Sequence, residues 1–162
     1  MTRTTSRRSD AQLAADLVRR VLPEPSWAAR HTLVAALNGL PLSPAQLTLF
    51  RDCTARQRSP SRPVTEAFIL SGRRSGKTRA ASAIAVASAV IRRYTLAPGE
   101  KGVVLLLGAD RRQAAISKNY IAEMVRSVPA LAAHVVNETR ESIELLWITA
   151  TSCSKSARPT TG

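Results

Sequence analysis

Cysteine and histidine are scarce in this sequence, and their scarcity limits what can hold the fold together. The 162-residue chain has two cysteines, Cys53 and Cys153, and two histidines, His31 and His134. These residues are far apart in the sequence, so no Cys-x-x-Cys pair or Cys/His cluster exists. We therefore expect neither a disulfide framework nor a structural zinc site.

Long apolar runs are missing as well. The longest, residues 80–91, has about twelve residues and contains two serines, whereas a bilayer crossing needs about 20. The basic segment at residues 1–8 is followed by no uninterrupted apolar stretch, because Asp10 and Asp16 interrupt it, so no targeting peptide is predicted. We expect a soluble, cytoplasmic protein that makes no contact with a membrane.

Acidic residues are few relative to basic ones. Lys and Arg number 24 against 11 Asp and Glu, which gives a formal net charge of +13. This surplus favours a polyanionic partner, because phosphates neutralised by Lys or Arg release condensed counterions. An arginine surplus that reflects only base composition is the alternative. Apolar residues make up 44% of the chain, enough for one globular domain with a core.

Helix signals dominate the first third of the chain. Asp10 is suited to cap a helix that Pro23 stops, and a second helix is expected over residues 26–37. A third begins at Ser43-Pro44-Ala45-Gln46, which has a capping serine, proline at the first helical position and glutamine at the third. A basic, proline-broken linker follows at residues 56–63.

The pattern changes after this linker. Short β-rich runs at residues 64–70, 103–107 and 142–149 predict strands, and the segments 77–93 and 110–125 between them predict helices. Alternating strands and helices indicate parallel strands joined by right-handed crossovers. The sequence therefore predicts an α/β fold with a parallel sheet.

The segment 71–78 ends in Gly-Lys-Thr and lies between an expected strand and an expected helix, as in phosphate-binding loops. Gly76 would let the backbone approach phosphates closely, Lys77 would reach the β- and γ-phosphates, and Thr78 would place its hydroxyl on Mg²⁺. The match to Gly-x-x-x-x-Gly-Lys-[Ser/Thr] is imperfect, because Ser71 stands at the first glycine position. The alternative is a strand-to-helix turn that is merely rich in Gly and Arg.

The loop Gly72-Arg73-Arg74-Ser75-Gly76-Lys77-Thr78 resembles the deviant Walker A motif of large terminase subunits, the motors that package DNA into phage heads. The segments 42–56, 102–114 and 141–145 resemble the surroundings of that motif, so that the resemblance covers residues 42–145. It implies a RecA-like P-loop ATPase core, incomplete here, preceded by a small helical N-terminal region. It also implies ATP and Mg²⁺ as cofactors, and double-stranded DNA, the small terminase subunit and the capsid portal as partners, in the cytoplasm of a phage-infected or prophage-bearing host.

The resemblance also assigns roles to residues. Lys77 and a loop arginine, Arg73 or Arg74, would be catalytic, and Thr78 would contact the metal. The nucleotide would be held by Gly72, Ser75, Gly76, Lys77 and Thr78. Gln46 has two interpretations, a contact to the adenine edge or the capping box with Ser43, and we favour the cap.

The carboxylates that such an ATPase needs are missing. Asp110 follows an aliphatic run, but Arg111 and Arg112 come next, so we interpret it as a helix cap and not as a magnesium ligand. We expect a truncated, inactive terminase with an N-terminal region at residues 1–62, a partial ATPase domain at 63–150 and a disordered or aberrant tail at 151–162. The alternatives are a fragment of a helicase-like translocase and a non-catalytic basic DNA-binding protein with a relic loop.

Overall fold

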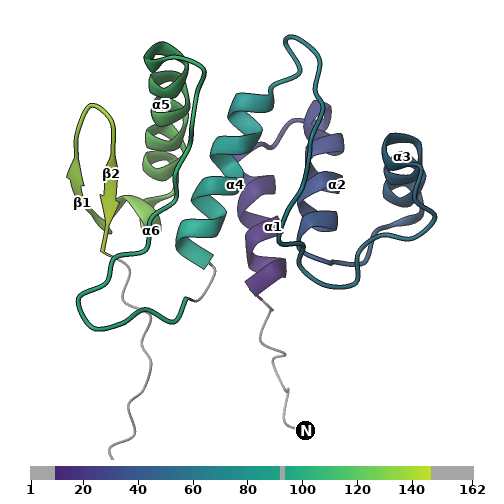
Figure 1. Cartoon of the computed structure of the whole chain (residues 1–162), viewed down its shortest axis with the longest axis horizontal. Coiled ribbons are helices and arrows are strands. Elements are labelled where there is room, and N and C mark those ends of the chain that lie inside the picture. Colours follow the sequence, from purple (N-terminus) through teal and green to yellow (C-terminus); the bar gives the residue numbers. More distant parts are fainter. Residues whose placement is uncertain (1–9, 92–93, 147–162) are drawn as a thin grey trace, which may run out of the picture.

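The computed structural model describes residues 10–91 and 94–146, which form helices and one small β-hairpin (Figure 1). The elements in chain order are α1 (Asp10–Val21), the 3₁₀ helix η1 (Pro25–Trp27), α2 (Ala28–Leu37), α3 (Pro44–Thr54), α4 (Lys77–Ile91), α5 (Arg111–Ser127), α6 (Pro129–Ala132), β1 (Val135–Glu138) and β2 (Ile143–Leu145). Helix is therefore the dominant secondary structure of the described residues.

The helices predicted from the sequence are confirmed, and two of their caps have the expected geometry. At α3, the Ser43 hydroxyl accepts from the Gln46 backbone N–H, and the Gln46 side chain accepts from the Ser43 N–H, which completes the capping box. At α5, the Asp110 carboxylate accepts from the Gln113 N–H at 2.8 Å. Gln46 and Asp110 thus both act as helix caps.

Helix α4 is the centre of the packing. It lies between α1 and α5 (Figure 1), and most of its alanine and valine side chains are buried. Their small size lets the neighbouring helices approach closely, and the core beside them holds Val18 of α1 and Leu22, the residue directly after α1, both fully buried. The buried Ser82 hydroxyl lies 2.9 Å from the Thr78 carbonyl oxygen and 3.1 Å from that of Ser117, which ties α4 to α5.

The predicted parallel sheet is wrong. The described residues contain one sheet, in which β1 and β2 pair antiparallel as a hairpin. Residues 64–70 and 103–107 are not strands, and no RecA-like core forms. The predicted last strand is confirmed only as β2, and residues 147–149 lie outside the described residues.

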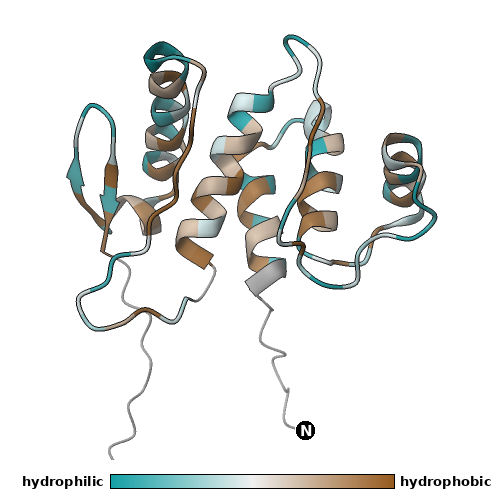
Figure 2. Cartoon of the chain, viewed as in Figure 1, coloured by the Kyte–Doolittle hydropathy of each residue, from teal (hydrophilic) through white to brown (hydrophobic). Residues whose placement is uncertain are grey.

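The two segments expected to be central strands lie extended along the outside of the helices, and much of each is apolar (Figure 2). Leu70 is 100% exposed, Phe68 90% and Leu107 86%, so these side chains contribute nothing to the core. Both segments have the apolar composition that is typical of strands. A strand also needs backbone hydrogen bonds to a neighbouring strand. Within the described part of the chain, neither Phe68–Leu70 nor Val103–Leu107 takes part in a backbone hydrogen bond.

Matched leucine substitutions test this placement. Leu22→Ala removes a fully buried side chain and should lower the free energy of unfolding by about 2–5 kcal/mol. Leu70→Ala removes a fully exposed one and should change it by less than about 0.5 kcal/mol. Urea denaturation followed by circular dichroism measures both. A loss at Leu70 equal to that at Leu22 would place residues 64–70 in the core after all.

Candidate phosphate-binding loop

The predicted loop connects an extended, exposed segment to the N-terminus of α4, and this surface turn holds every predicted site residue. Gly72, Arg73, Arg74 and Lys77 are exposed, whereas Ser75, Gly76 and Thr78 are partly buried. Lys77 and Thr78 are the first two residues of α4. The helix after the loop is thus confirmed, while the strand before it is not.

Two loop residues have a left-handed backbone, Arg74 with φ 59° and Gly76 with φ 73°. Glycine adopts this conformation freely, which explains the residue at position 76. Arginine does so at a cost of about 1–2 kcal/mol, so that the loop has a strained residue beside its glycine. Gly72 has ordinary φ and open space around the position of a Cβ atom, so the loop's shape does not require a glycine there.

Unpaired hydrogen-bond donors gather where α4 begins. The first backbone bond of the helix runs from the Ala80 N–H to the Gly76 carbonyl at 3.0 Å. The N–H groups of Lys77, Thr78 and Arg79 therefore precede the helix's own ladder and point out of its N-terminal end. That end also has the positive pole of the helix dipole, which attracts anions.

Cationic residues lie in the same turn as these donors, without local carboxylates to balance them. Arg73, Arg74 and Lys77 form no ion pair or side-chain hydrogen bond with any described residue, and the first turn of α4 has no acidic residue. Positive side chains at a helix N-terminus oppose the dipole, so this arrangement is unfavourable unless an anion is present. The charge distribution of the loop is that of an anion site.

Residues much earlier in the chain contact the loop, and no sequence pattern predicted these contacts. The Arg30 guanidinium donates to the Ser75 carbonyl oxygen at 2.7 Å, and the Trp27 ring lies against Gly76. Arg79 lies between two aromatic rings, 5.9 Å from the centroid of Trp27 and 5.8 Å from that of Tyr120. Nothing in the sequence pairs Trp27 or Arg30 with a loop more than forty residues later, so this support was visible only in three dimensions.

Carboxylates for a resident metal ion are not built into the site. The described residues contain no group of three His, Cys, Asp or Glu side chains close enough to hold a metal. Asp110 is engaged as the cap of α5, as expected. A cavity of about 200 Å³ lies under residues 64–67 against α2 and α4, and the loop does not line it.

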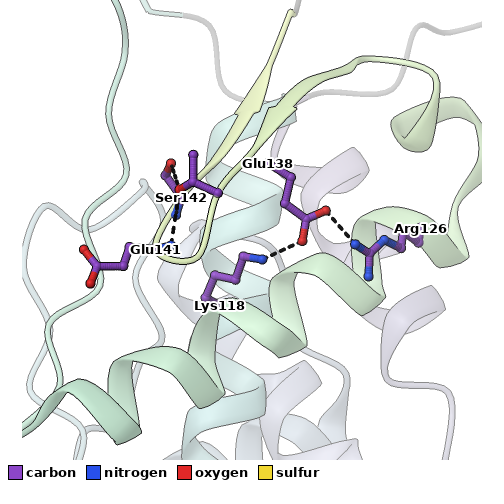
Figure 3. A network of polar contacts seen from close by, with 6 residues as sticks. Lys118, Arg126, Glu138, Glu141 and Ser142 are labelled. Carbon is purple, nitrogen blue, oxygen red and sulfur yellow. Dashed lines mark hydrogen bonds and ion pairs between the residues drawn. The ribbon is translucent and has the colours of Figure 1, made fainter.

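A separate polar network fixes the hairpin to α5 (Figure 3). The Glu138 carboxylate accepts from Lys118 at 2.5 Å and from Arg126 at 2.6 Å. The hydrogen bond from Lys118, assisted by the charge of Arg126, holds the pKa of Glu138 below its ordinary value of 4.5. Lys118 is thus engaged in an intramolecular ion pair.

The lowered pKa of Glu138 predicts an acid-sensitive hairpin. Because the pKa is lower in the folded protein, the ion pairs stabilise the fold above the ordinary value of 4.5, and this contribution disappears as pH falls through the folded pKa. Amide NMR signals of residues 135–145 should therefore shift toward unfolded positions between about pH 5 and about pH 3. Glu138→Gln should weaken this acid response, and an identical response in both proteins would contradict it.

Comparisons with known protein families, with curated proteins and with solved structures each found no match. Among the described helices, none is long and apolar enough to cross a membrane. The geometry of the loop is consequently the main observation on which a function can be argued.

Proposed function

We propose that the loop at residues 71–78 binds the phosphate groups of ATP, and that the chain is the ATP-binding part of a DNA-packaging motor of the large terminase kind. The observation that carries the proposal is the presence of three unpaired cations, Arg73, Arg74 and Lys77, in the same turn as the free N–H groups at the start of α4. An anion with several oxygens satisfies both sets of donors at once. The resemblance of the loop to the deviant Walker A motif adds the identity of that anion.

The residues fit a phosphate better than they fit a metal. Lys77 supplies a point charge for the β- and γ-phosphates, and Arg73 or Arg74 supplies a guanidinium fork that matches two phosphate oxygens. The only oxygen donor assigned to Mg²⁺ is the Thr78 hydroxyl, and Mg²⁺ commonly keeps several waters and binds through substrate phosphates. We therefore expect Mg²⁺ to arrive with the nucleotide, and hydrolysis by the chain itself to be negligible.

The charge of the whole chain supports the second part of the proposal. A formal net charge of +13 attracts a polyanion over distances set by the ionic strength. Double-stranded DNA in the host cytoplasm is the polyanion that the resemblance implies, with the small terminase subunit and the capsid portal as protein partners.

One observation favours a second candidate, a non-catalytic basic DNA-binding protein. The described residues lack both a parallel sheet and a carboxylate cluster, and these are parts that a P-loop ATPase uses to position Mg²⁺ and water. In that protein the basic charge would bind DNA and the loop would have no nucleotide to hold. The two candidates differ in whether ATP binds and whether it changes DNA binding.

Lys77→Ala tests the nucleotide site. Loss of a charge-assisted bond to phosphate should weaken binding of a fluorescent ATP analogue about tenfold or more, without changing the melting temperature, because Lys77 is exposed. Arg20→Ala is the matched control, since it removes one exposed cation from a different element, α1. Equal affinities of the two variants and the wild type would refute a phosphate role for Lys77.

DNA binding, measured by fluorescence anisotropy, tests whether the chain is part of an ATP-dependent motor. The affinity for a duplex should fall steeply with added salt under either candidate, because both release counterions. Only an ATP-dependent motor predicts that Mg-ATP changes this affinity, and that Lys77→Ala abolishes the change. Identical salt curves with and without Mg-ATP would favour the non-catalytic protein.

A further inference from the structure

The phosphate loop is attached to the N-terminal helices by two specific contacts. Arg30, in the first turn of α2, donates to the Ser75 carbonyl oxygen at 2.7 Å across 45 residues of sequence. A charge-assisted bond of this length is among the stronger ones in proteins. It fixes the backbone of the loop immediately before Gly76.

The second contact is made by Trp27 at the end of η1. A Cβ atom placed on Gly76 would lie 2.5 and 2.6 Å from two carbon atoms of the Trp27 ring, so the ring rests directly on the glycine backbone. The same ring has the Arg79 guanidinium 5.9 Å from its centroid. Trp27 therefore contacts the residue just before Lys77 and Thr78, which is Gly76, and the residue just after them, which is Arg79.

These contacts matter because the loop has little internal support. Within the described residues, no hydrogen bond connects the Arg73, Arg74 and Lys77 side chains to the rest of the chain, and the extended segment before the loop is exposed. A loop without such support must be ordered by its ligand, which costs affinity. The left-handed Arg74 adds strain that surrounding contacts must hold.

We propose that Trp27 and Arg30 are positioning residues, through which the N-terminal helical region holds the loop in its anion-accepting shape and sets its affinity for phosphate. Neither side chain is assigned a contact to the nucleotide; both act through Ser75 and Gly76. The inference rests on the proposed function for its effect on affinity, whereas its effect on loop order is independent of any nucleotide. A partner that displaces η1 and α2 would accordingly release the loop.

Limited trypsin digestion tests loop order without ligand. The loop contains three exposed sites, Arg73, Arg74 and Lys77, and the exposed linker at residues 56–58 provides an internal reference. Arg30→Met and Trp27→Leu should raise the rate of loop cleavage relative to linker cleavage about tenfold, since the loop opens more often. Arg30→Lys and Trp27→Phe should restore part of the protection.

Two controls separate positioning from general destabilisation. Arg20→Met removes an exposed arginine from α1, and Leu22→Ala weakens the core at a residue that itself makes neither loop contact. Below the melting temperature of each protein, both controls should keep the wild-type ratio of loop to linker cleavage. Both should also keep the wild-type affinity for the fluorescent ATP analogue, whereas Arg30→Met and Trp27→Leu should lower it about tenfold.

The outcomes distinguish failure of the inference from failure of the proposed function. Unchanged loop cleavage in Arg30→Met and Trp27→Leu overturns the inference, whether or not ATP binds. Raised cleavage with unchanged ATP affinity overturns the link between loop order and phosphate binding. If the wild type binds no ATP analogue, the proposed function fails, and the cleavage ratio still decides whether the N-terminal helices hold the loop.

Discussion

The burial of α4 between α1 and α5 is the contact on which the rest of the structure depends. Small side chains on α4, among them the fully buried Ala83 and Ser82, let both neighbours approach, and larger core residues come from the elements around it, such as Val18 of α1 and Met124 of α5. This packing fixes the helix axis and so fixes where its N-terminus emerges. The loop at residues 71–78 takes its position from that packing, because it ends in the first two residues of α4, and its cations lie close in sequence to the positive end of the helix dipole.

The N-terminal helices have two roles in this arrangement. Helix α1 packs against one side of α4, while η1 and α2 contact the loop through Trp27 and Arg30. Residues from both sides of the proposed boundary at 62 and 63 share one core, although the division into domains stays a prediction. A site that looks local in the sequence, eight residues long, is thus held by residues far earlier in the chain.

The helices were predicted well because the signals that specify a helix, such as its cap, lie within a few residues of one another. Ser43 and Gln46 specify a cap three residues apart, and Asp110 does the same for α5. Two of the three predicted strands, residues 64–70 and 103–107, were wrong because an apolar run specifies composition and not a partner, and pairing depends on another segment of chain. The loop was found from Gly76, Lys77 and Thr78, whereas Trp27 and Arg30 had no pattern to connect them with it.

The central claim is that phosphate groups, and not a base or a sugar, are what the loop binds. Isothermal titration of the wild-type protein with ATP, ADP, AMP and adenosine, each with Mg²⁺, tests it most directly. The account predicts affinity that falls in that order, with no binding of adenosine, because it assigns the donors at the start of α4 and the nearby cations to phosphate oxygens. Equal affinity for all four ligands, or none for ATP, would contradict it.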